Sequence, residues 1–328
     1  METENIHGSI DASFDDMLAS LSELVGIPSV LEESERSDAH PFGPRMTEAL
    51  EKFLETARKF GFRTANIDNM SGYAEIGEGP LFGVLAHLDV MPAGNAENWE
   101  SPPFEMTIAD GRVYGRGVND DKGPAVSALY ALKALAGSGV KLNRRFRIIA
   151  GLDEESGFRC IERYKNSEEI PEMSFSPDGM FPVVNGEKGI INFIMRRKIS
   201  GVDTARLPEL SSIRGGDRFN IVPDKLELFF RRASAGNLEL VLMPIGATVE
   251  STGNGVLVQV HGRSAHAMEP QKGDNSIQKF LAAVESLDFG PPELHAGLTK
   301  LGTLFKMETD GTSLGIACSD DVSGALTC

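Results

Sequence analysis

A histidine and several acids follow short apolar stretches of this chain, where they could assemble a metal site. The first stretch, 81–86, reads Leu-Phe-Gly-Val-Leu-Ala and ends in His87, with Asp89 two residues later. Because side chains alternate in direction along a strand, His87 and Asp89 point the same way. One residue can therefore bind a metal ion while the other orients the imidazole ring.

Acids at three later points of the chain complete this candidate site. Asp120 precedes a predicted helix, Glu154 and Glu155 follow the apolar run 145–151, and Asp178 lies in an Asp-Gly turn. Taken alone, they have ordinary explanations as a helix cap, a solvated cluster and a turn residue. Acids placed directly after buried strands must, however, be solvated, paired or bound to metal. Together they favour a site.

Imidazole and carboxylate groups are ligands for borderline and hard divalent ions, and a carboxylate can bridge two ions. One histidine with several acids therefore suits a two-metal hydrolytic site, in which the ions generate hydroxide near neutral pH and polarise a carbonyl. The adjacent residues Glu154 and Glu155 can have different roles. Because adjacent residues point differently, one can bind metal while the other transfers protons.

The elements that position these residues alternate between helices and strands. Apolar residues at helical spacing predict helices over 13–25, 44–60 and 275–287, and the segment 115–124 opens another helix that ends at about 136. Short apolar or alternating runs predict strands over 63–67, 72–76, 81–86, 145–151, 190–199 and 256–261, with a hairpin between 104 and 114. We expect an α/β domain over residues 1–186 and a smaller α+β domain over residues 187–328.

The composition narrows the classes of partner. The 328 residues include 48 acidic and 32 basic ones, a formal net charge of -16, which argues against nucleic acid or an anionic membrane as a partner. Three cysteines without metal-type spacing, and no segment that resembles a secretory signal or a transmembrane helix, predict a soluble cytoplasmic protein. Small molecules or peptides are the expected partners.

The order of the motifs resembles the aminoacylase and carboxypeptidase G family of co-catalytic zinc metallopeptidases. The motifs are His87-x-Asp89, Gly115-Arg116-Gly117 followed by Asp120-Asp121-Lys122-Gly123, Asp153-Glu154-Glu155-Ser156-Gly157 and Pro177-Asp178-Gly179. The Asp-Asp-Lys-Gly-Pro form and the loop 266–270 are most similar to the PepV-type dipeptidase branch. The resemblance covers most of the chain. It implies a catalytic domain with a mixed central sheet flanked by helices, and an α+β lid domain.

The resemblance also implies the metal ligands and the cofactor. His87 and Asp178 would bind one zinc ion, Glu155 would bind a second, and Asp120 would bridge the two. A complete site would hold two Zn²⁺ ions, with Mn²⁺ or Co²⁺ as possible substitutes. An aspartate at position 178, where related carboxypeptidases and acylases tend to carry glutamate, implies a dipeptidase acting on substrates with a free amino end.

The remaining roles belong to proton transfer and substrate binding. Glu154 would act as general base and then general acid, activating a metal-bridging water and protonating the leaving amine. Asp89 would orient the ring of His87. From the lid, His266 and Asn220 would reach the substrate. A histidine after a strand is more often an ordinary surface residue, and only the setting Ser-Ala-His favours this role for His266.

Family members also carry a further histidine ligand and a substrate-binding arginine beyond the position where this sequence stops. His295 does not match the surroundings of that ligand. The resemblance therefore predicts a chain without the end of the lid and the C-terminal catalytic segment. Two main hypotheses follow: a zinc dipeptidase in truncated form, or a catalytically impaired remnant that could associate with itself through its incomplete lid sheet. A deacylase or amidohydrolase on the same scaffold is a third hypothesis.

Overall fold

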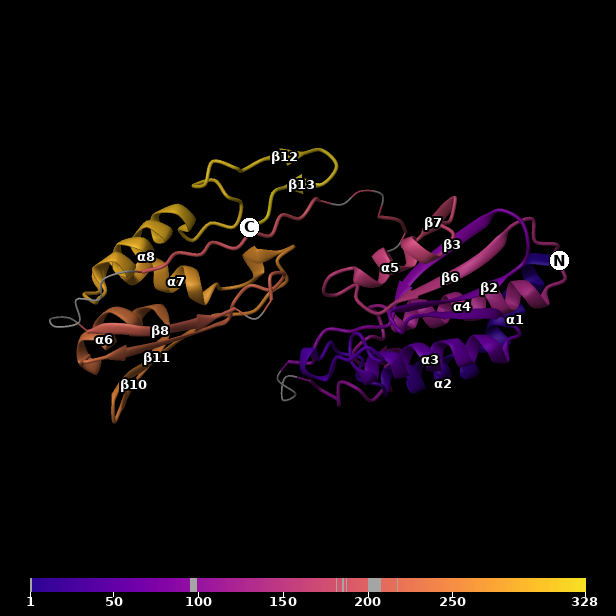
Figure 1. The fold of residues 1–328 in the computed structure, drawn as a ribbon, viewed down its shortest axis with the longest axis horizontal. Coiled ribbons are helices and arrows are strands. Elements are labelled where there is room, and N and C mark those ends of the chain that lie inside the picture. The colour runs from indigo at the N-terminus through magenta and orange to yellow at the C-terminus, as the bar shows by residue number, and fades with distance from the viewer. Residues whose placement is uncertain are drawn as a thin grey trace. The chain divides into compact units, whose positions relative to one another are not determined.

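The computed structural model describes residues 2–94, 99–180, 182–184, 186, 188–199, 208–216 and 218–328. Its contacts divide the chain into two units, Met1–Val184 and Asn185–Cys328, which are drawn from indigo to magenta and from rose to yellow in Figure 1. The predicted boundary falls at position 187, which lies outside the described residues. The predicted roles of catalytic domain and lid remain predictions.

A five-stranded mixed sheet lies at the centre of the first unit, in the strand order β1-β2-β6-β3-β7 (Figure 1). Its strands are β1 (Arg63–Ile67), β2 (Ser71–Ile76), β3 (Leu81–His87), β6 (Arg145–Gly151) and β7 (Met173–Phe175). Strand β3 runs parallel to both β6 and β7, and His87 pairs with Gly151. The carboxyl ends of β3 and β6 therefore meet at one edge of the sheet, as the apolar runs predicted.

Helices cover both faces of this sheet. On one face, α3 (Pro44–Lys59) and α4 (Lys122–Gly137) pack on the strands over a core that includes Ile148. On the other face, α5 (Arg159–Ser167) brings Tyr164 against Ile149, the next residue of β6. The remaining elements are α1 (Glu2–Ala12), α2 (Phe14–Val25), a 3-10 helix at Glu33–Glu35, and the hairpin of β4 (Thr107–Ala109) and β5 (Arg112–Tyr114).

Sequence periodicity placed both ends of α2 and α3 and the end of α4 within one or two residues of the observed positions, and it missed α1 and the short α5. Helix α5 contains four charged residues in nine, so its single buried stripe around Tyr164 is narrow. Within the described part of the chain, no helix combines the length and the apolar character needed to cross a bilayer.

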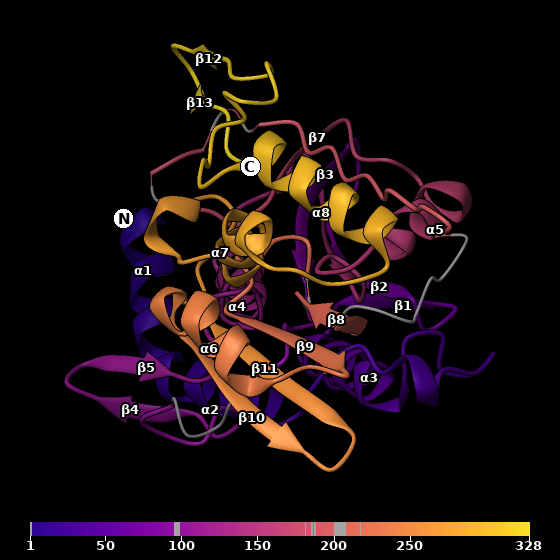
Figure 2. The same ribbon diagram turned by 90° about the vertical axis from the view of Figure 1, so that its left-hand side faces the viewer.

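The second unit contains a four-stranded antiparallel sheet in the order β10-β11-β9-β8 (Figure 2). The strands are β8 (Glu209–Gly215), β9 (Lys225–Arg231), β10 (Ala247–Thr252) and β11 (Gly255–His261). Alternate residues of β9 and β11 are buried against α6 (Ala235–Leu242) and α7 (Ser276–Ala283). The other elements are α8 (Pro292–Phe305), 3-10 helices at Met243–Ile245, Pro270–Lys272 and Val284–Ser286, and the short strands β12 (Ser319–Asp320) and β13 (Gly324–Ala325).

The long strand predicted over 190–199 is wrong. Residues 188–199 form no strand, and the side chains of Ile190 and Ile191 are 85% and 88% exposed. A strand needs a neighbour for its backbone hydrogen bonds as well as apolar side chains. The sheet of the second unit is built from the four later strands without this segment, and side-chain pattern alone does not show whether a neighbour is present.

The three cysteines differ in burial, which predicts their reactivity. Cys160 is fully buried, and burial raises the pKa of its thiol to about 11, whereas Cys318 and Cys328 are exposed. Because the thiolate is the reactive form, we expect a disulfide reagent at pH 8 to label two thiols rapidly in the native protein. A third should react only in denaturant. Rapid labelling of three thiols in the folded chain would contradict the buried position of Cys160.

Candidate metal centre

The ring of His87 lies among carboxylates that come from three other segments. Its Nε2 atom is 2.9 Å from Asp120 Oδ1, 3.4 Å from Asp178 Oδ2 and 3.9 Å from Glu154 Oε2. His87 is the last residue of β3, and the acids follow from the loop before α4, the turn after β6 and the turn after β7. The structure therefore brings four of the predicted site residues together at the carboxyl edge of the parallel strands, where ligands gather in open α/β sheets.

This donor set fits a divalent cation. Among the described residues, Nε2 of His87 is buried and makes no hydrogen bond, although carboxylates lie close to it. Ligand atoms of His87, Glu154 and Asp178 all lie within 4.8 Å of one another. An imidazole nitrogen and carboxylate oxygens that converge in this way form a ligand set suited to zinc or manganese. The residues present can hold such an ion at the ring of His87.

Asp89 contacts both the ring of His87 and the turn that carries Glu154 and Glu155. The backbone carbonyl of Asp89 lies 2.9 Å from Nδ1 of His87, and its carboxylate lies 3.4 Å from the same nitrogen. The carboxylate also accepts the backbone N–H groups of Glu154 at 3.2 Å and Glu155 at 3.0 Å. The predicted orienting contact with His87 is thus accompanied by an anchor for the two glutamates. Sequence reasoning missed this anchor because it joins β3 to the turn after β6.

The pKa values of the two glutamates at the centre are shifted upward by burial and by neighbouring acids. Burial, followed by the charge of Asp120, raises the pKa of Glu155 to about 7. Burial also raises the pKa of Glu154. For His87, burial lowers the pKa, but the nearby carboxylates outweigh it and the net shift is upward. Carboxylates that lie close together away from water repel one another, so a cation between them is favoured.

Two buried charged residues follow Asp120 and were not assigned a role from the sequence. The carboxylate of Asp121 accepts the backbone N–H of His87 at 2.9 Å, and Nζ of Lys122 donates to the carbonyls of Leu24 at 2.8 Å and Ile27 at 2.6 Å. Burial raises the pKa of Asp121 to about 7 and lowers the pKa of Lys122 to about 7. The motif Asp-Asp-Lys-Gly was the only signal for them, and it does not say which residues they contact.

Asp153, the first of the three consecutive acids, stabilises the turn that carries the glutamates. It is fully buried, and its two carboxylate oxygens accept Nε and Nη2 of Arg159, each at 2.7 Å. Its Oδ2 also accepts the backbone N–H of Arg159 at 2.9 Å. The run Asp153-Glu154-Glu155 therefore combines one acid that pairs with Arg159 and two whose backbone N–H groups are held by Asp89.

The predicted substrate residues of the second unit lie on neighbouring loop segments. The N–H of Ala267 donates to the carbonyl of Asn220 at 2.8 Å, and Ile221 forms a β-bridge with His266. The N–H of Met268 donates to Nδ1 of His266 at 3.1 Å. Since Nδ1 accepts, Nε2 of the exposed His266 is left to carry the ring proton and to act as a donor.

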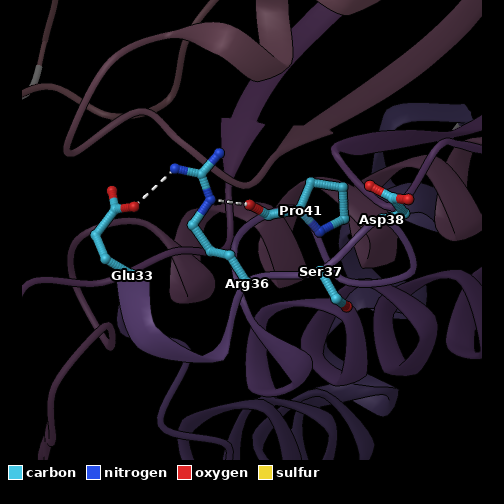
Figure 3. A pocket seen from close by; sticks show the side chains of 5 residues that line it. All are labelled: Glu33, Arg36, Ser37, Asp38 and Pro41. Atoms are coloured by element: carbon cyan, nitrogen blue, oxygen red, sulfur yellow. Dashed lines mark hydrogen bonds and ion pairs between the residues drawn. The ribbon is translucent and has the colours of Figure 1, made fainter.

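A separate depression of about 490 Å³ lies on the first unit and is lined by Glu33, Arg36, Ser37, Asp38 and Pro41 (Figure 3). The guanidinium of Arg36 is paired there with Glu33 at 2.7 Å and donates to the carbonyl of Pro41 at 2.7 Å. None of its lining residues is a predicted site residue. An apolar cavity of about 320 Å³ in the second unit lies between α7, α8 and the segment that follows α8.

Comparison with known proteins identifies the family. Residues 83–291 match the family model described as Peptidase family M20/M25/M40. "Putative dipeptidase YtjP" of Bacillus subtilis is 37% identical over 323 residues, which cover 95% of this chain and 68% of that protein. "Putative dipeptidase SSP1012" of Staphylococcus saprophyticus is 36% identical over 330 residues, with the same coverage of each chain.

Among solved structures, the dipeptidase Dug1p of Saccharomyces cerevisiae matches with 23% identity and a TM-score of 0.43, covering 50% of this chain and 37% of that chain. The family match begins inside β3, just before His87, and extends into the second unit as far as the residue before α8. On the strength of the family match and the sequence relatives, the chain belongs to Peptidase family M20/M25/M40 and is a metallopeptidase-type hydrolase.

Proposed function

We propose that this chain hydrolyses the peptide bond of dipeptides with a free amino end, and that its metal centre binds two zinc ions. One observation carries the proposal: Nε2 of buried His87 faces carboxylates from three separate segments at distances of 2.9 to 3.9 Å. The names of the bacterial relatives support the dipeptide as substrate. Asp178, in place of a glutamate, agrees with a free amino end.

In this proposal His87, Asp120, Glu155 and Asp178 hold the ions. Bound zinc would lower the pKa of a water molecule and polarise the substrate carbonyl. Glu154 takes the proton of the attacking water and passes it to the leaving amine. Its side chain is 36% exposed while its backbone is tied to Asp89. It is thus both fixed in place and open to a substrate.

Asn220 and His266 are proposed to contact the substrate from the second unit. Their loops are hydrogen-bonded to each other through Ala267, so the two side chains are presented by one local structure. The Nε2 proton of His266 is a donor suited to the oxygen of a polarised carbonyl. The amide of Asn220 offers both a donor and an acceptor for the substrate backbone.

The proposal is tested with the purified 328-residue chain, Zn²⁺ or Mn²⁺, and the pair Ala-Ala and N-acetyl-Ala-Ala. We expect hydrolysis of Ala-Ala that a chelator removes and added metal restores, and no hydrolysis of the acetylated peptide. Equal hydrolysis of the acetylated peptide would favour the deacylase hypothesis. Activity that survives chelation would overturn the metal mechanism, and a metal-loaded chain that hydrolyses neither peptide would favour the catalytically impaired remnant.

A further inference from the structure

On one side of β3, the central sheet loses its pairing strand before His87. Strand β7 pairs with β3 only at Phe82, Gly83 and Val84, and it ends at Phe175. Beyond that point, β3 keeps its neighbour β6 on the other side, where the N–H of Leu88 donates to the carbonyl of Gly151 at 2.9 Å. Because consecutive N–H groups of a strand point to opposite sides, the N–H of His87 faces the side that β7 has left.

A side chain takes the place of the missing strand. Oδ2 of Asp121 accepts this N–H at 2.9 Å, and both residues are buried. Asp121 occupies the N-cap position of α4, yet its side chain makes no capping hydrogen bond. An aspartate at an N-cap ordinarily accepts an N–H of its own helix, a contact that contributes about 1 kcal/mol. Here its carboxylate reaches across to β3 instead.

The neighbours of Asp121 hold it in this position. Asp120, on one side, faces the ring of His87, with 2.9 Å between Asp120 Oδ1 and Nε2. Lys122, on the other side, is fixed by the carbonyls of Leu24 and Ile27. One short segment therefore contacts His87 twice, at the ring through Asp120 and at the backbone through Asp121.

We propose that Asp121 is a positioning residue of the metal centre, whose carboxylate completes the hydrogen bonding of β3 at His87 and thereby sets the direction of the imidazole. The inference rests on the proposed function in that His87 is taken as a metal ligand. Removing a hydrogen-bond partner of a metal-binding side chain typically lowers metal affinity by about 10-fold to 100-fold. The contact of Asp121 with the backbone of His87 also fixes the direction of the imidazole, so we expect its loss to have an effect of the same kind.

The test compares Asp121→Ala with Asp121→Asn, whose amide oxygen can accept the same N–H. We expect Asp121→Ala to weaken Zn²⁺ binding, measured by competition with a chromophoric chelator, by at least about 10-fold. Asp121→Asn should stay within about 3-fold of the wild-type chain. The matched control is Glu75→Gln, because Glu75 is a buried acid of β2 outside the metal centre. We expect this variant to lower stability without changing zinc affinity.

Hydrogen exchange at the His87 amide in the metal-free protein gives a second readout. Asp121→Ala should speed this exchange, and Asp121→Asn and Glu75→Gln should not. Asp121→Ser, too short to reach β3, replaces the alanine variant if that variant does not fold. Unchanged exchange at His87, or equal loss of zinc affinity in Glu75→Gln and Asp121→Ala, would overturn the positioning role. If the wild-type chain bound no zinc, the proposed function would fail, and the exchange measurement alone would decide the contact of Asp121.

Discussion

Glu154→Gln is expected to lower kcat for dipeptide hydrolysis by about 10²-fold to 10⁴-fold, the usual contribution of general acid–base catalysis. The glutamine keeps the size of the side chain and the backbone contact of Glu154 with Asp89, but it has no basic oxygen to accept a proton from water. Zinc binding should be nearly unchanged, because the proposal gives the ligand role to Glu155.

Glu155→Gln is the matched comparison for this experiment, since the two residues are adjacent and their N–H groups share the acceptor Asp89. We expect this variant to lose zinc along with its activity. Kinetics at saturating zinc and metal content after dialysis separate the two effects. If Glu154→Gln lost zinc while Glu155→Gln retained it, the two roles would be interchanged. Such an outcome would agree with the closeness of Glu154 to His87 and Asp178.

Glu75→Ala is expected to lower the free energy of unfolding of the first unit by about 3 to 5 kcal/mol, the usual cost of removing one partner of a buried ion pair. Glu75 is 5% exposed, and its Oε2 lies 2.7 Å from both Nε and Nη2 of Arg147, which is 3% exposed. Without Glu75, the guanidinium keeps its contacts with Tyr164 and Glu168 but loses its closest carboxylate.

Glu78→Ala is the control for this prediction. Its carboxylate pairs at 3.0 Å with Arg63, which also pairs with Glu75, but the Glu78 side chain is 87% exposed. Exposed pairs contribute about 0 to 1 kcal/mol because water screens them. Urea unfolding followed by the fluorescence of Trp99, the only tryptophan, reports on the first unit. Equal and small losses in the two variants would show that the buried pair adds little to stability.

Strand β3 shows why part of the centre was predictable. The apolar run 81–86 and the change of residue type at His87 are local features, and the structure ends the strand at His87. The same holds for β6 and the acids that follow it. Residues 190–199 have an equally strong apolar pattern and form no strand. The difference lies in the presence of a pairing neighbour, which is not encoded in the segment itself.

The sequence by itself determined the family, the strands that carry the candidate ligands, and the acids able to hold metal, because residue type and short-range periodicity are local properties. The tertiary structure alone decided what each buried acid contacts. Asp89 holds the backbone of the two glutamates, Asp121 holds the backbone of His87, and Asp153 holds Arg159. The first two contacts depend on the strand order β6-β3-β7, because it decides which backbone N–H groups lack a neighbouring strand and which loops meet at the edge of the sheet.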